Sequence, residues 1–303
     1  MPQSLNVLVI GGSGFLSGTL AARAVAEGHS VTVVTRGQRE LPEGVSGIAV
    51  DRHDQPAFKK AISKASRHWD LVVDCIAYDP ADARQDIDVF PGMADHLVFV
   101  STDFVFNPAH RIFPQPEITD HYTPGENYGS KKRLCELEFL NSDTGEMVWS
   151  IVRPCHIYGP GSLLGCLPEH GRDPELISKI RLGKPLKLVG GGHFLQQPIL
   201  AGDLSDLMLS LHGNEKSHGE IFCTAGPDII ESREYYNIIA DVLGADHPEI
   251  VEIPVGKFLA ENPQSCSFAC HRIYSHAKLE ATGARVPTTP ISDGLRQHTE
   301  SLL

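Results

Sequence analysis

The stretch Val7-Leu8-Val9-Ile10-Gly11-Gly12-Ser13-Gly14-Phe15-Leu16-Ser17-Gly18 decides the fold of this chain. An apolar run at 5–10 leads into a glycine-rich turn, and apolar residues then recur at helical spacing as far as residue 27. A strand, a glycine turn and a helix in this order are typical of a dinucleotide-binding βαβ unit, although a plain tight turn has a similar sequence. The glycines let the backbone approach a pyrophosphate, and N–H groups at the start of the helix can bind it. The predicted cofactor contacts in this stretch are Gly11, Ser13, Gly14, Phe15 and Leu16.

Apolar or β-branched segments alternate with helical segments over the next 75 residues or so. We expect strands at 30–35, 47–51, 70–77 and 96–101, and helices at 56–66 and 80–90. This alternation predicts parallel strands joined by right-handed crossovers. The fold class is therefore α/β, with a Rossmann doubly wound parallel sheet.

The second half of the chain has a different character. A loop rich in Pro and polar residues at 107–127 precedes a predicted helix at 128–140 and a strand at 147–153, and Gly and Pro are dense from 154 to 198. Further helices are predicted at 174–182, 203–212 and 232–243, and strands at 221–224 and 250–253. We therefore divide the chain into a Rossmann dinucleotide-binding domain, 1–153, to which later strands return, and a smaller C-terminal α/β lobe, 154–303, that mainly binds substrate.

The composition argues against several classes of function. The formal net charge is −12, from 26 Lys and Arg against 38 Asp and Glu, whereas nucleic-acid binding needs a cationic surface. The apolar run near the N-terminus is too short for a signal peptide or a bilayer span, so we expect neither a nucleic-acid nor a membrane partner. The seven cysteines form no Cys-x-x-Cys pair and the 15 histidines no i, i+4 pair with a carboxylate. This predicts free thiols, a cytoplasmic location and no metal site.

The residue after the second predicted strand indicates which nucleotide cofactor is bound. Dinucleotide folds often have an acidic residue there, which bonds the ribose of NAD, but this chain has Arg36. A guanidinium suits the 2′-phosphate of NADP, and Arg39 is near enough in sequence to help. We therefore predict NADP, with NAD as the alternative; an exposed loop arginine has the same sequence. Asp51 is predicted to bond the adenine amino group, unless it is a solvated turn residue.

The segment Tyr128-Gly129-Ser130-Lys131-Lys132 carries the predicted chemistry. Tyr128 and Lys132 are four residues apart and share one face of the predicted helix. A nearby ammonium lowers the pKa of a tyrosine from its ordinary value of about 10, which would let Tyr128 exchange a proton with a carbonyl or alcohol. Thr102, with Ser101 assisting, is predicted to hold the substrate oxygen beside Tyr128. The plain alternative is a surface helix with a solvated lysine.

At these residues the chain resembles an extended or atypical short-chain dehydrogenase/reductase of the NAD-dependent epimerase/dehydratase family, from residue 5 to about 295. The segment Arg153-Pro154-Cys155-His156-Ile157-Tyr158-Gly159-Pro160 is similar to the family's Arg-Pro-x-x-x-Tyr-Gly-Pro, which passes beside the nicotinamide. Ser101-Thr102-Asp103-Phe104-Val105-Phe106 is similar to a stretch of dTDP-4-dehydrorhamnose reductases. The resemblance implies further cofactor contacts at Ala77, Pro154 and His156 and substrate contacts at Tyr78, Ser101 and Asp103. It also implies a homodimer paired through the helix that carries Tyr128.

The chain departs from the family pattern at three places. Ser17 replaces the third glycine of Gly-x-x-Gly-x-x-Gly, where a small residue still allows close packing. No asparagine occurs at 82–90, where extended members have a fourth catalytic residue. Gln196 and Gln197 stand near the place of an arginine that binds a sugar-linked diphosphate. We therefore expect His193, Gln196 or Gln197 to bond a neutral polyol or a carboxyl group of the substrate.

The predicted function is hydride transfer at a secondary alcohol or ketone of a sugar or sugar derivative, by an NAD(P)-dependent oxidoreductase or epimerase. Tyr128 is the general acid/base, Lys132 tunes it and holds the nicotinamide ribose, and Thr102 orients the substrate oxygen. The sequence leaves reduction and epimerisation both open. The alternative is a non-catalytic cofactor- or RNA-binding protein, because 35–37 and 74–80 look like an atypical branch that includes chloroplast stem-loop RNA-binding proteins.

Overall fold

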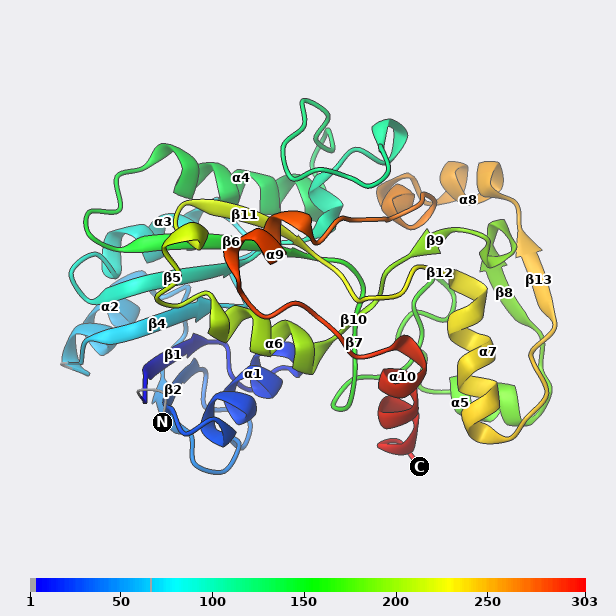
Figure 1. The fold of residues 1–303 in the computed structure, drawn as a ribbon, viewed down its shortest axis with the longest axis horizontal. Coiled ribbons are helices and arrows are strands. Elements are labelled where there is room, and N and C mark those ends of the chain that lie inside the picture. The colour runs from blue at the N-terminus through cyan, green and yellow to red at the C-terminus, as the bar shows by residue number, and fades with distance from the viewer. Residues whose placement is uncertain (1–3, 66) are drawn as a thin grey trace.

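The computed structural model describes residues 4–65 and 67–303. Its centre is a parallel sheet of seven strands in the order β11-β6-β5-β4-β1-β2-β3 (Figure 1). These strands are β1 (Asn6–Ile10), β2 (Ser30–Thr35), β3 (Ser46–Ala49), β4 (Trp69–Asp74), β5 (Ala94–Val100), β6 (Val148–Pro154) and β11 (Glu220–Thr224). The strand order reverses between β1 and β4, so the sheet is doubly wound, which confirms the predicted fold class.

Alternate side chains of the strands build two apolar cores, one on each face of the sheet. Val7 and Val9 belong to one core and Leu8 and Ile10 to the other, and all four are fully buried. A sheet covered on both faces requires strands that are apolar at every position. This explains why β1 shows a continuous apolar run rather than alternation with polar residues.

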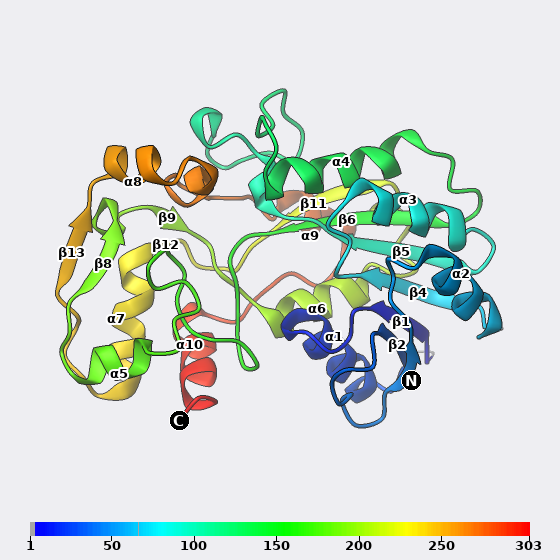
Figure 2. The same cartoon turned by 180° about the vertical axis from the view of Figure 1, so that it is seen from behind.

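Helices cover both faces of the sheet, as Figures 1 and 2 show from opposite sides. The core of Val7 is closed by α1 (Phe15–Ala26), α6 (Ala201–Ser210) and α9 (Ala277–Thr282). The core of Leu8 is closed by α2 (Gln55–Lys64), α3 (Pro80–Val89) and α4 (Tyr128–Asn141). Ser66, the last residue of the helix predicted at 56–66, lies outside the described residues.

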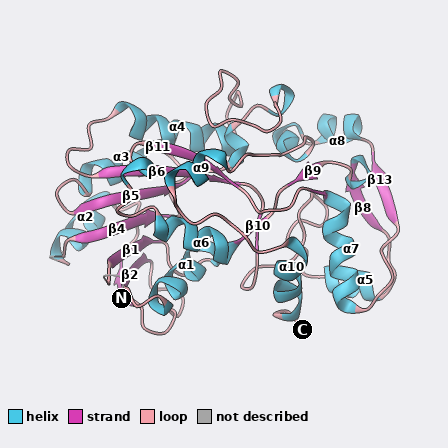
Figure 3. Cartoon of the chain, in the orientation of Figure 1, coloured by secondary structure: helices cyan, strands magenta, loops and turns pink. Residues whose placement is uncertain are grey.

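The C-terminal lobe, whose helices and strands Figure 3 shows, has a core of its own around Tyr235, Tyr236 and Leu295. Its helices are α5 (Leu176–Arg181), α7 (Ser232–Leu243), α8 (Val255–Glu261) and α10 (Ile291–Glu300). Its strands pair two by two: β7 (Ile157–Tyr158) with β10 (Ile199–Leu200), β8 (Leu186–Val189) with β13 (Ile250–Ile253), and β9 (Leu195–Gln196) with β12 (Ile230–Glu231). The short 3-10 helices are η1 (Asp103–Val105), η2 (Pro108–His110), η3 (Gly190–Gly192), η4 (Glu215–Ser217) and η5 (Pro263–Phe268).

The second half of the chain contributes to both parts of the molecule. β11 extends the large sheet beside β6, and α6 packs on α1. The chain therefore crosses between sheet and lobe more than once, and a boundary at residue 153 stays a prediction. No helix within residues 4–65 and 67–303 combines the length and the apolar character needed to cross a membrane.

Candidate active site

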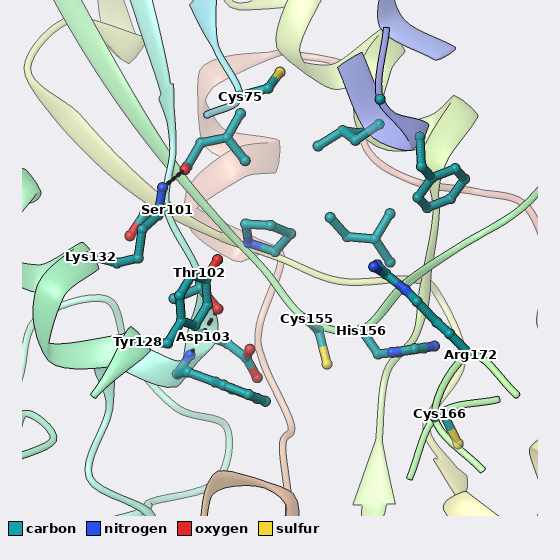
Figure 4. Close-up of a pocket in the computed structure, with 18 of the residues that line it drawn as sticks. Cys75, Ser101, Thr102, Asp103, Tyr128, Lys132, Cys155, His156, Cys166 and Arg172 are labelled. Carbon is teal, nitrogen blue, oxygen red and sulfur yellow. Dashed lines mark hydrogen bonds between the residues drawn. The ribbon is translucent and has the colours of Figure 1, made fainter. Parts of the chain in front are cut away.

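A cavity of about 590 Å³ lies at the carboxyl ends of the central strands, where the lobe meets the sheet (Figure 4). Segments 14–17, 100–104 and 154–157 line it from the sheet side, with Tyr128 and Lys132 of α4. From the lobe come Arg172 and Arg272. Open α/β sheets bind ligands at this edge, because the strand order reverses there and leaves a crevice.

The glycine loop has the geometry that a pyrophosphate requires. Gly12 has φ +82°, and a Cβ there would lie 2.3 Å from a carbon of Val33, so only glycine fits. Ser17 is buried, and its hydroxyl accepts a hydrogen bond of 3.2 Å from the N–H of Gly14, so a small serine does pack at the third-glycine position. α1 starts at Phe15 with no acidic residue in its first turn, and its N-terminus faces the cavity. These residues fit a bound dinucleotide.

Tyr128 is placed by the cap of α4 and by a close backbone contact. The Asn127 side chain accepts a hydrogen bond of 3.0 Å from Ser130 N, which starts the helix at Tyr128. A Cβ at Gly129 would lie 1.9 Å from the carbonyl oxygen of Phe104, so glycine alone allows α4 to approach η1. This approach brings Tyr128, 48% exposed, beside Thr102 at the cavity wall.

The pKa of Tyr128 differs from the sequence prediction. Burial, followed by Tyr78 and Asp103, raises this pKa to about 12, while the Thr102 hydroxyl acts in the opposite direction. Lys132 is not among the largest causes of this shift, and the net lowering of the pKa that the sequence predicts is not found in the protein alone. The reason is that the ammonium is directed at main-chain carbonyls instead.

Lys132 is 1% exposed and is held from two sides. Its Nζ donates to the carbonyl oxygens of Ala77 at 2.7 Å and Val100 at 2.5 Å, and lies 4.2 Å from the ring centre of Phe99. An ammonium has three N–H donors, so one remains for a ligand. Desolvation lowers the pKa of Lys132 from 10.5 to about 8.

A buried charge cluster fixes the carbonyl that holds Lys132. The Asp74 carboxylate accepts from the N–H of Ile76 at 2.7 Å and of Ala77 at 2.9 Å, and its other oxygen accepts from Arg52. Arg52 also pairs with Asp86 at 3.1 Å. Burial alone would raise the pKa of Asp74, but Arg52 holds it below its ordinary value. Burial, followed by the nearby Asp74 carboxylate, raises the pKa of Asp86, while Arg52 acts in the opposite direction.

Ser101 lines the cavity, but its hydroxyl is engaged elsewhere. It donates to Glu136 at 2.6 Å, and Glu136 also receives Nε and Nη2 of Arg153 at 2.8 and 2.7 Å. Both charged partners are fully buried, and Arg133 adds a further bond at 2.9 Å. Ser101 is therefore part of this ion-pair network, and Thr102 is the residue with a hydroxyl near Tyr128.

Gln196 and Gln197 do not line the cavity, so their predicted substrate contact stays a prediction. Gln196, 1% exposed, accepts from Arg272 at 2.8 Å and donates to Ser232 at 3.0 Å. Gln197 accepts from the N–H of Tyr274 at 2.5 Å and donates to a main-chain carbonyl. Gln196 instead holds Arg272, which does line the cavity.

The remaining predicted residues divide between the cavity and the surface. Phe15, Leu16, Tyr78, Asp103, Pro154 and His156 line the cavity. Asp103 accepts from the Tyr274 hydroxyl at 2.7 Å, so its carboxylate is bound within the protein. Burial, followed by Arg272 and Arg172, lowers the pKa of His156 to about 3, which keeps its ring neutral.

Six of the predicted site residues do not line the cavity: Gly11, Ser13, Arg36, Asp51, Ala77 and His193. His193 is exposed and pairs with Glu231 at 3.1 Å, and its predicted substrate contact stays a prediction. Arg36 is exposed, and Asp51 accepts from the N–H of His53 at 3.0 Å. The predicted adenosine contacts of these two residues stay predictions. Across residues 4–65 and 67–303 no cluster of three His, Cys, Asp or Glu could hold a metal ion.

Sequence reasoning missed Glu136, Arg172 and Arg272. No local motif marks them, because their partners are 17 to 169 residues away or on the opposite wall. Arg272 pairs with Gln196 through an isolated bridge between distant segments, which only the folded chain creates.

Comparison with known proteins defines the class. Residues 7–224 match the model of the NAD dependent epimerase/dehydratase family, and the chain belongs to this family. The 2′-dehydrokanamycin reductase of Streptomyces kanamyceticus is 28% identical over 252 residues, 80% of this chain and 68% of that protein. The chloroplast stem-loop binding protein of 41 kDa b of Arabidopsis thaliana is 25% identical over 261 residues, 81% of this chain and 65% of that protein. The chain thus spans about two thirds of the length of these relatives.

Solved structures share the fold. The UDP-glucose 4-epimerase of Thermotoga maritima, solved with UDP-glucose, superposes with a TM-score of 0.77 at 20% identity, over 98% of each chain. The UDP-glucose 4-epimerase of Thermus thermophilus, solved with NAD, gives 0.73 at 19% identity, over 98% of this chain and 99% of that one. The predicted family and fold are therefore confirmed.

Proposed function

We propose that the chain is an NAD(P)-dependent oxidoreductase or epimerase that transfers a hydride at a secondary alcohol or ketone of a sugar or sugar derivative. The observation that carries the proposal is that the glycine loop, Thr102, Tyr128 and Lys132 open onto one cavity. A nicotinamide and a substrate oxygen can therefore meet beside a hydroxyl that transfers protons. Family membership and relatives named as a reductase and as epimerases support the proposal.

A bound nicotinamide would supply or accept the hydride; the side chains supply the rest. Tyr128, with its pKa at about 12, is protonated at neutral pH and is set to donate its proton to a ketone oxygen. Thr102 would orient that oxygen with its hydroxyl. Lys132 would hold the nicotinamide ribose with its third N–H, because the other two donate to Ala77 and Val100.

Two arginines that follow β2 support NADP as the cofactor. Arg36 is exposed directly after the strand, and Nη1 of Arg39 donates to the carbonyl oxygen of Ser13 in the glycine loop at 3.1 Å. A guanidinium at this strand end suits the 2′-phosphate of NADP. NAD, with which the Thermus thermophilus epimerase was solved, is the alternative.

The experiment that tests the proposal has two steps. First, NADPH and NADH are titrated into the protein by calorimetry, with Arg36→Ala as the matched variant. We expect about tenfold tighter binding of NADPH, lost in Arg36→Ala, since a charge-assisted phosphate contact contributes about 1.5–3 kcal/mol. Second, keto-sugars and polyols are screened with the preferred cofactor. Failure to bind either cofactor, together with tight binding of structured RNA at physiological salt, would favour the RNA-binding alternative.

We also propose a cytoplasmic homodimer paired through α4, as in the family. Sedimentation at micromolar concentration tests the dimer, with Leu134→Asp on the exposed part of α4 as the disrupting variant. A monomeric wild-type protein would contradict this part of the proposal alone.

A further inference from the structure

Arg172 of the C-terminal lobe is aimed at the glycine loop across the cavity. It comes from the segment before α5, and its side chain extends into the cavity from the side opposite Tyr128 and Lys132 (Figure 4). Its guanidinium carbon lies 6.0 Å from the ring centre of Phe15, the first residue of α1. The side chain therefore faces the helix end that would bind a pyrophosphate.

Arg172 is exposed, and its charge has no counter-charge within the described part of the chain. Within residues 4–65 and 67–303 its guanidinium has no ion pair and no hydrogen bond, only the contact with the Phe15 ring. The other cavity arginine, Arg272, is buried against Asp103 and Gln196. Arg172 still acts on the cavity electrostatically, because it contributes to the lowered pKa of His156. A cation without a counter-charge in a ligand cavity favours an anionic ligand group.

The backbone that carries Arg172 is fixed in an unfavourable conformation. Arg172 has φ +53°, in the left-handed region that residues with side chains rarely adopt. The following residue, Asp173, ties the turn down: its N–H donates to Leu164 O at 2.9 Å, and its carboxylate binds His170 and Lys179, each at 2.8 Å. Non-glycine residues held in this region are often found at ligand sites, and here the turn presets the direction of the arginine.

The lobe and the glycine loop already meet next to this arginine. The chain leaves β7 through Gly161, whose Cβ position lies 3.6 Å from the Phe15 ring. Arg39 binds the carbonyl oxygen of Ser13 within the loop itself. One cation from the sheet domain and one from the lobe thus lie near the start of α1, while a dinucleotide pyrophosphate carries two negative charges.

We propose that Arg172 binds the cofactor pyrophosphate from the lobe side. This inference rests on the proposed function, because it assumes that a dinucleotide occupies the glycine loop. The guanidinium would bond the phosphate oxygens that face away from the N–H groups of α1, with the planar fork that suits phosphate.

The test measures binding rather than turnover. ADP-ribose, which has the pyrophosphate but no nicotinamide, and AMP, which lacks the pyrophosphate, are titrated by calorimetry into the wild type, Arg172→Gln and Arg172→Lys. Arg181→Gln is the matched control, since this exposed arginine of the same lobe does not line the cavity. We expect Arg172→Gln to bind ADP-ribose about tenfold more weakly than the wild type and to bind AMP with an affinity within about twofold of it. ADP-ribose binding by this variant should also depend less on salt, and Arg172→Lys should recover part of the lost affinity.

Three other results would overturn the inference. If Arg172→Gln binds ADP-ribose as tightly as the wild type does, Arg172 does not bind the pyrophosphate, while the proposed function stands. If the substitution weakens AMP binding as much as ADP-ribose binding, it changes the site in general and Arg172 does not act on the pyrophosphate. If wild-type protein binds neither ADP-ribose nor NADPH, the proposed function fails first and this inference fails with it.

Discussion

Lys132 is expected to lower the stability of the protein at neutral pH, and replacing it should reveal this as a pH-dependent difference. The substitution is Lys132→Met, which keeps a side chain of similar length and removes the charge. Its two hydrogen bonds, to the carbonyls of Ala77 and Val100, are lost at every pH. The charge, by contrast, matters only where the lysine is protonated, so the two effects are separable.

The sign follows from linkage. In the folded protein the pKa of Lys132 is lowered from 10.5 to about 8, so the unfolded chain binds this proton more tightly. Below pH 8 the folded state must hold a charge that burial disfavours, and the full destabilisation is present. Between pH 8 and 10.5 the folded state loses the proton first, and the destabilisation is relieved as the pH rises. One pKa unit corresponds to about 1.4 kcal/mol. Between pH 7 and pH 9 the free energy of unfolding of the wild type should therefore rise by roughly 1 kcal/mol relative to that of Lys132→Met.

The assay is thermal unfolding of both proteins at pH 7, 8 and 9. A relative gain of roughly 1 kcal/mol corresponds to about 1.5–2 °C in Tm for a chain of 303 residues. Lys131→Met is the matched control, because Lys131 is half-exposed and makes a surface ion pair with Asp79 at 3.1 Å. Its Tm should run parallel to wild type within about 1 °C over this pH range. If Lys132→Met and wild type also run parallel, Lys132 does not titrate near pH 8 and the reasoning from its burial is wrong.

Three further predictions, one of them with a matched control variant, test other parts of the structure. Tyr128→Phe should lower turnover on any substrate found by roughly 10²–10⁴-fold and leave the Kd for NADPH unchanged, and wild-type turnover would refute the proposed acid/base role. Glu136→Gln leaves the buried Arg153 without its counter-charge and should cost about 3–5 kcal/mol in the free energy of unfolding, measured by denaturant titration. Glu138→Gln in the more exposed pair with Arg84 should cost less than about 1 kcal/mol; equal losses would contradict the buried network. Gly129→Ala should lower Tm, because its Cβ would lie 1.9 Å from a carbonyl oxygen, and an unchanged or higher Tm would show that α4 can shift freely.

The sequence by itself determined the sheet, the glycine loop and the pair on α4. These features depend on residues that are close in the chain: an apolar run, a glycine turn and a tyrosine four residues before a lysine. Local geometry then dictates the outcome, since a buried strand, a positive-φ turn and one helix face each follow from their own few residues. Even Ser17 could be judged in this way, because its effect is limited to packing beside the loop.

Only the tertiary structure decided which polar groups are free for a ligand. Ser101, Gln196 and Gln197 have suitable side chains, but the fold engages them with Glu136, Arg272 and main-chain groups. The direction of the Lys132 ammonium depends likewise on carbonyls that are 55 and 32 residues away. Burial and such partners set both pKa values and accessibility, and they arise from contacts between distant segments. Sequence spacing therefore identifies the residues that can do the chemistry, whereas packing across the sheet and lobe selects the ones that are available to do it.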